Sequence, residues 1–158
     1  MFPLEKEDAP ASIMMGFLKP VNIWHWKAAR RNEGLARPYI DYYNPNERGT
    51  LLATHREDIS ASRPGSEIID NIATMPGTIT PKENQQVSGR GIWSAGRWTV
   101  SFSRALQTSS DQDTQIDAPG TLSAAFAVWK GEKQERGSRK SISDWIIFKL
   151  LPREGKRP

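Results

Sequence analysis

The sequence predicts a mostly β protein, built as an antiparallel β-sandwich with long irregular or short-helical insertions. Three observations lead to this fold class. Short segments alternate apolar and polar side chains, polar or glycine-containing turns separate them, and few segments carry a helical pattern. A length of 158 residues suits one domain with its own core. We expect this single domain over residues 1–152, followed by a basic tail at 153–158.

The first clear strand is predicted at residues 21–28, Val-Asn-Ile-Trp-His-Trp-Lys-Ala. Side chains along a strand alternate between its two faces. One face would therefore carry Val21, Ile23, His25 and Lys27, and the other Asn22, Trp24, Trp26 and Ala28.

Residues 29–85 lose this alternation, because Pro, Gly, Asn, Arg and Asp recur throughout them. We expect long irregular excursions here, and long loops of a compact domain commonly serve a function such as binding. Within this region, residues 66–73 (Ser-Glu-Ile-Ile-Asp-Asn-Ile-Ala) are expected to form a short helix.

A β-hairpin is predicted where order returns. Residues 86–93 and 97–104 read as strands, and Ser94-Ala95-Gly96 between them supplies a glycine for the turn. The apolar face of the second strand would carry Trp98, Val100 and Phe102.

The C-terminal part is expected to hold two more strands. A polar loop at 107–120 precedes a strand at 121–129, a charged turn follows at 130–140, and the last strand covers 143–150. The inward residues of the strand at 121–129 would be Leu122, Ala124, Phe126 and Val128.

Composition excludes several kinds of chemistry. The chain has no cysteine, which excludes disulfides, zinc fingers, iron–sulfur ligation and thiol catalysis. No apolar run reaches the length of a membrane span. The net charge is +4, but no recognition helix or aromatic RNA-binding motif accompanies the basic clusters, so we expect no nucleic-acid partner.

The polar residues alone point to no catalytic or metal site. His25 and His55 have no metal-ligand spacing, so His25 is interpreted as an ordinary, partly exposed histidine. No nucleophile elbow frames the Ser, His and Asp residues. Asp111, Asp113 and Asp117 lack the glycine and glutamate of a calcium loop and are interpreted as a solvated acidic loop. A methionine such as Met15 would by itself be core filler.

Three blocks of sequence, in order, resemble one family. The first is Met15-Gly16 with residues 20–28 (Pro-Val-Asn-Ile-Trp-His-Trp-Lys-Ala). The second is 89–93 (Gly-Arg-Gly-Ile-Trp) with 96–104 (Gly-Arg-Trp-Thr-Val-Ser-Phe-Ser-Arg), and the third is 125–131 with 135–145. Together they resemble the haem b-binding gamma subunits of the ethylbenzene dehydrogenase type. These subunits serve molybdenum enzymes of the dimethyl sulfoxide reductase superfamily.

The resemblance implies a haem b whose iron lies between a methionine sulfur and a lysine amine. By position these are Met15 and Lys140, with Met14 as the alternative if the register slips by one residue. Trp26, Trp98 and Phe102 would wall the haem or fill the core. The arginines that would pair with haem propionates or stay solvated at the surface are Arg90, Arg97 and Arg104.

The function implied is electron transfer and not catalysis. The haem would relay electrons between an iron–sulfur subunit, beside a molybdopterin catalytic subunit, and an external carrier such as a c-type cytochrome. Periplasmic residence is implied too, although the N-terminus lacks a signal-peptide pattern and a genuine start there would imply the cytoplasm. Only fourteen residues precede Met15, so we expect N-terminal strands of the family to be missing. The alternative function is a cofactor-free β-sandwich module that binds a carbohydrate or a protein partner through exposed tryptophans.

Overall fold

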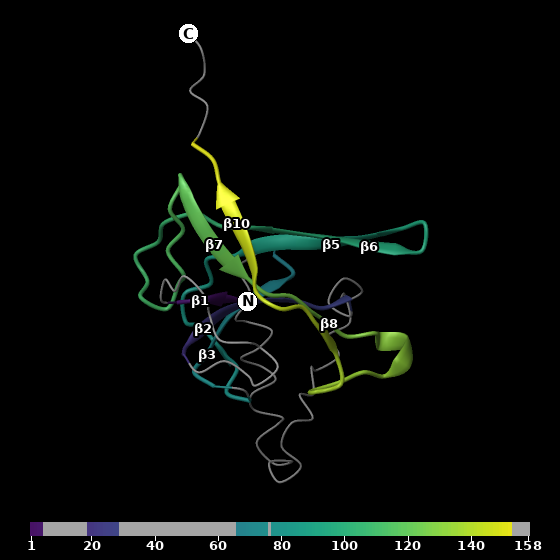
Figure 1. The fold of residues 1–158 in the computed structure, drawn as a ribbon. Coiled ribbons are helices and arrows are strands. Elements are labelled where there is room, and N and C mark those ends of the chain that lie inside the picture. Colours follow the sequence, from purple (N-terminus) through teal and green to yellow (C-terminus); the bar gives the residue numbers. More distant parts are fainter. Residues whose placement is uncertain (5–18, 29–65, 76, 153–158) are drawn as a thin grey trace.

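The chain is described by a computed structural model over residues 1–4, 19–28, 66–75 and 77–152. These residues form antiparallel strands, with η3 (Gly131–Lys133) as a short 3₁₀ helix (Figure 1). The strands are β1 (Phe2–Pro3), β2 (Val21–Trp26), β3 (Ile68–Ala73), β4 (Thr80–Pro81), β5 (Ser88–Ser94), β6 (Arg97–Ser103), β7 (Gly120–Ala124), β8 (Ala127–Val128), β9 (Ser141–Ile142) and β10 (Ile146–Leu150). The mostly β, antiparallel fold class is therefore confirmed. In the described part of the chain no helix has the length and apolarity needed to cross a bilayer.

The central sheet has the strand order β1-β2-β3-β4, and all its neighbours are antiparallel. Strands β2 and β3 pair along their whole length, from Val21 opposite Ala73 to Trp26 opposite Ile68. The short helix expected at 66–73 is wrong, because this segment is strand β3. Its residues are buried on both faces, so the apolar–polar alternation that marks a half-buried strand is absent.

A second ribbon joins the free side of β1. The Met1 amine donates to the Ala125 carbonyl at 3.0 Å, and the Ala125 N–H donates to the Met1 carbonyl at 2.9 Å. Ala125 directly follows β7, which pairs with β10 from Gly120 opposite Leu150 to Ala124 opposite Ile146. The ribbon β7–β10 is thus linked to the central sheet through Met1, the residue before β1.

The strand predicted at 121–129 is interrupted after Ala124. Ala124 and Ala125 are both buried, so the alternation slips by one residue, as at a β-bulge. Phe126 and Val128 consequently point outward, with 52% and 59% of their surface exposed, and their predicted inward orientation is wrong. Ser143 fixes this offset, because its N–H donates to the Phe126 carbonyl and its hydroxyl accepts from the Phe126 N–H. The last predicted strand, 143–150, is observed as β10 over Ile146–Leu150, and the short strand β9 lies just before the predicted range.

The predicted hairpin is confirmed as β5–β6. Its turn places Ala95 and Gly96 at φ values of 49° and 74°, the left-handed pair that matches the twist of two-residue hairpins. Strand pairing puts Gly91, Trp98 and Phe102 on one face of the hairpin, which lies against the β2–β3 sheet as a second layer. The end of the hairpin extends beyond that sheet (Figure 1).

Close approach of the two layers requires a glycine at position 91. A β-carbon at Gly91 would lie 2.1 Å from Cζ2 of Trp26, far inside van der Waals contact. The backbone of β5 therefore rests directly on the indole ring. This explains why a strand with apolar neighbours carries glycine here.

Candidate functional site

Lys140 lies at the end of the loop that connects β8 to β9. The loop contains η3 and two residues with left-handed backbone, Gln134 at φ 53° and Gly137 at φ 55°. The exposed Lys140 side chain folds back over this loop, and its Nζ donates to the Gly137 carbonyl at 3.2 Å. The same Nζ lies 5.3 Å from the ring centroid of Trp129.

Trp129 completes this arrangement. Its Nε1 donates to the same Gly137 carbonyl at 3.1 Å, and its ring lies 6.1 Å from the His25 ring on β2. Lys140, Gly137 and Trp129 thus form a group, here called the lysine cradle, that is attached to the central sheet at His25. The sequence interpretation gave Trp129 no role of its own. One signal was available in the sequence. Trp129 ends the strand predicted at 121–129 and Lys140 ends the turn that follows, and an antiparallel ribbon brings the end of one strand beside the start of the next.

Met15 and its alternative Met14 lie outside the described residues. The predicted approach of a methionine sulfur to Lys140 therefore stays a prediction. His25 agrees with its interpretation as a partly exposed histidine.

The predicted aromatic residues come together elsewhere. Trp26 and Trp98 meet edge to face with ring centroids 4.8 Å apart, and Phe102 lies 6.2 Å from Trp24. This aromatic layer fills the space between β2 and the hairpin. Because His25 and Trp26 are adjacent in a strand, the aromatic layer and the lysine cradle lie toward opposite faces of β2. Contact of Trp26, Trp98 or Phe102 with a haem stays a prediction.

Glu67 holds the aromatic layer in place. Its Oε2 accepts from Trp26 Nε1 at 2.8 Å and from the Gly91 N–H at 2.9 Å. One carboxylate oxygen thereby joins β2 to the hairpin.

Four charged side chains are buried where the face of β3 that bears Asp70 meets the loops after β4 and β6. Lys82 Nζ pairs with Asp70 Oδ2 at 2.8 Å and also with Asp113 Oδ1, and Arg104 Nη1 reaches Asp113 Oδ1 at 3.1 Å. This set, Asp70, Lys82, Arg104 and Asp113, is called the buried quartet below. Its formal charges balance, as burial of ions requires.

Neutral groups satisfy the rest of the buried quartet. Asn22 Nδ2 donates to Asp70 Oδ1 at 2.6 Å, and the Thr108 hydroxyl donates to Asp113 Oδ2 at 2.7 Å. The pKa of Asp70 is nevertheless raised, because loss of hydration on burial outweighs the hydrogen bonds from Lys82 and Asn22.

The buried quartet corrects two expectations. The solvated acidic loop is wrong for Asp113, whose carboxylate is buried between two cations. For Arg104, the solvated surface setting is wrong, because its guanidinium is buried in this ion pair and lies 5.3 Å from the Trp24 ring centroid. Its pairing with a haem propionate stays a prediction. The second cation on Asp113, Lys82, is 31 residues away in the sequence, and spacing alone does not reveal such a partner.

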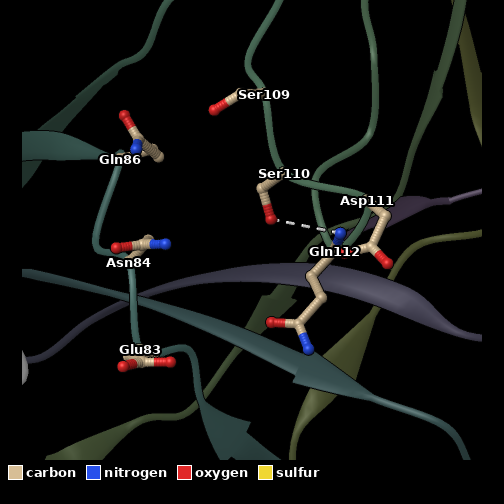
Figure 2. Close-up of a pocket in the computed structure, with 7 residues that line it drawn as sticks. All are labelled: Glu83, Asn84, Gln86, Ser109, Ser110, Asp111 and Gln112. Atoms are coloured by element: carbon tan, nitrogen blue, oxygen red, sulfur yellow. Dashed lines mark hydrogen bonds between the residues drawn. The ribbon is translucent and has the colours of Figure 1, made fainter.

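A polar hollow of about 310 Å³ lies between the loop after β4 and the loop after β6 (Figure 2). The side chains that line it are Glu83, Asn84, Gln86, Ser109, Ser110, Asp111 and Gln112. It has no aromatic wall, and the tryptophans Trp24, Trp26 and Trp98 pack on other aromatic rings or on the hairpin backbone. Two other tryptophans are exposed, Trp93 with 50% and Trp129 with 37% of its surface accessible, so the alternative function stays a prediction. Among the residues that the structure describes, no group of three or more His, Asp or Glu side chains could hold a metal ion.

Comparison with known proteins adds a family match. Residues 1–141 match the family model described as ethylbenzene dehydrogenase. A protein of Haloferax mediterranei with the name "Putative respiratory nitrate reductase heme subunit ORF7" is 28% identical over 150 residues, which cover 95% of this chain and 41% of the relative.

Two further relatives carry gamma-subunit names. The chlorate reductase subunit gamma of Ideonella dechloratans is 23% identical over 91% of this chain and 46% of its own length. The dimethylsulfide dehydrogenase subunit gamma of Rhodovulum sulfidophilum is 24% identical over 97% of this chain and 48% of its own length. The chain thus spans a little under half the length of these relatives.

Proposed function

The chain belongs to the ethylbenzene dehydrogenase family, and from this premise we propose that it binds haem b and transfers electrons within a molybdenum oxidoreductase. The names of the relatives support this role, since one is a heme subunit and two are gamma subunits of redox enzymes. The catalytic site of such an enzyme would belong to another subunit.

The observation that carries the proposal is the state of Lys140. Iron binds a lysine amine only through a nitrogen lone pair, so the amine has to be reachable and free of a carboxylate partner. Lys140 is exposed, and its recorded contacts are a carbonyl and an aromatic ring. The ion pairs found among the described residues involve other cations. The residues present therefore fit an axial amine ligand.

Lys140 would hold one side of the iron, and Met15, or Met14 in the shifted register, the other. Held by both residues, the haem would supply electron transfer, and the protein would leave no open position on the iron for oxygen or substrate. The part of this chain is to bind and orient the haem and to shield it from water. We propose Trp129, beside Lys140, as the first aromatic neighbour of the haem on that side.

The partners proposed are an iron–sulfur subunit, a molybdopterin catalytic subunit and an external carrier such as a c-type cytochrome. The proposed location is the periplasm, as the resemblance implies. The direction of electron flow follows from the partners, because one relay serves dehydrogenases and reductases alike.

Reconstitution with haem tests the proposal. The purified chain with added haem should give a low-spin spectrum with reducible α and β bands. The Lys140→Ala variant should lose the six-coordinate spectrum. The control variant Lys149→Ala, which replaces an exposed lysine on β10, should keep it. An unchanged low-spin spectrum in Lys140→Ala would remove the ligand assignment, and a colourless unsubstituted chain would remove haem binding itself.

A further inference from the structure

We propose that Trp129 is the positioning residue for Lys140. Its side chain would fix the position of the Lys140 amine both before and after the amine binds iron. This inference rests on the proposed function, because it concerns the same amine. It goes further in assigning a role to a residue that would not touch the iron.

Three contacts carry the proposal. The indole ring lies 5.3 Å from Lys140 Nζ, within the range of a cation–π interaction. The indole N–H and the Lys140 amine donate to one oxygen, the Gly137 carbonyl, at 3.1 and 3.2 Å. Trp129 therefore restrains the amine twice, directly through its ring and indirectly by fixing the carbonyl that the amine uses.

Lys140 needs such restraint more than most ligands do. Its side chain has four rotatable bonds and lies exposed at the end of a loop, so an unrestrained amine would sample many positions. Gly137 adds backbone freedom, since it takes a left-handed conformation that glycine adopts at no steric cost. Holding the amine in one place removes this entropic cost from the binding step.

The cradle can persist once the amine is bound to metal. A coordinated amine has lost one proton and keeps two N–H groups, so one of them can still donate to the Gly137 carbonyl. The hydrogen bond from Lys140 to the Gly137 carbonyl is therefore compatible with the bound state.

Trp129 also ties the amine to the central sheet. Its ring lies 6.1 Å from the His25 ring of β2, so the indole stands between the loop and the sheet. Without the indole, the loop would lose a contact that fixes its position relative to β2.

The first experiment needs no haem. Nuclear magnetic resonance of the chain should show the Lys140 Cε protons shifted upfield by the ring current of the indole. Trp129→Leu should remove this shift, Trp129→Phe should retain part of it, and Trp93→Leu should leave it unchanged. Trp93 is the matched control, because it is a half-exposed tryptophan that packs on Trp98 of the hairpin. Equal Lys140 shifts in the unsubstituted chain and Trp129→Leu would overturn the proposal.

The second experiment measures ligation by competition. Imidazole is titrated into the haem-loaded chain, and the concentration that displaces the lysine is read from the spectrum. We expect Trp129→Leu to lower this concentration roughly three- to tenfold, and Trp129→Phe to recover part of the loss. If the unsubstituted chain is lysine-ligated but Trp129→Leu titrates identically, the positioning role fails alone. If Lys140→Ala and the unsubstituted chain titrate identically, the lysine ligand and the positioning role fail together.

Discussion

Lys82 Nζ lies 2.8 Å from Asp70 Oδ2, and both side chains are wholly withdrawn from solvent. The pair joins the centre of β3 to the loop after β4, and Asp113 on the other side of Lys82 adds a segment 31 residues away. Burying an isolated ion in this position would cost much free energy of folding, so the loss of one member would destabilise the whole buried quartet. It ties together three segments, namely β3, the loop after β4 and the loop after β6.

We expect Lys82→Met to destabilise the fold by about 3–5 kcal/mol, because it leaves two buried carboxylates with one cation. Chemical denaturation followed by tryptophan fluorescence measures the change. Lys149→Met on the exposed face of β10 is the control and should change stability by less than about 0.5 kcal/mol. Similar losses in both variants would mean that the buried quartet adds nothing specific.

Local pattern was enough to predict β2 and the hairpin. Residues Val21 to Trp26 are rich in β-branched and aromatic side chains and form β2, and Gly96 supplies a left-handed residue that the turn uses. For β3 local pattern misled, because Asp70 and Asn71 interrupt an apolar run that is buried on both faces. Asp70 finds its partner in another segment, Lys82. Asn71 donates to the Ile23 carbonyl of β2 and to the Ile69 carbonyl of its own strand.

The candidate site, like the fold, could be predicted only in part from the sequence. The resemblance pointed to Lys140, but its setting depends on Trp129 and on the backbone of Gly137, which become neighbours only when the ribbon folds. The slip at Ala124 and Ala125 was equally beyond a pattern argument. It accompanies the hydrogen bonds between Ala125 and Met1, which lie 124 residues apart in the sequence.

Gly91→Ala should destabilise the packing of the hairpin on β2 by about 1–3 kcal/mol. The added methyl would overlap the Trp26 ring, with its nearest atom at 2.1 Å and the next at 2.5 Å. Near-ultraviolet circular dichroism should lose part of the tryptophan signal, because the Trp26–Trp98 pair separates. Gly131→Ala is the matched control, since its β-carbon would meet nothing within 4 Å. Equal stability of the two variants would contradict the close approach of the layers.

Glu67→Ala should loosen the aromatic layer, because the Trp26 indole N–H and the Gly91 N–H lose their shared acceptor. The expected cost is about 1–3 kcal/mol, the range found when partly buried donors are left unpaired. Glu67→Gln keeps a carbonyl oxygen at the same reach and should lose much less. Tryptophan fluorescence during urea unfolding compares the three chains, and a glutamine variant as weak as the alanine variant would point to the charge as the stabilising feature.

The Met1 amine predicts a dependence of stability on pH. Burial against the Ala125 carbonyl lowers its pKa from 8.0 to about 5, because loss of hydration disfavours the ammonium. In the unfolded chain the amine takes up its proton near pH 8, whereas in the folded chain it does so only near pH 5. The unfolded state therefore binds more protons between these values, and the free energy of unfolding should fall as the pH is lowered from 8 to 5.

The full difference between the two pKa values corresponds to on the order of 4 kcal/mol. Urea denaturation at a series of pH values measures it, with the N-terminally acetylated chain as the control. Acetylation removes the titrating amine but keeps an N–H that can donate to the Ala125 carbonyl, so the acetylated chain should lose this slope. A slope of equal size in both chains would assign the pH dependence to other groups. It would also mean that the join between β1 and the β7–β10 ribbon accepts a charged terminus at little cost.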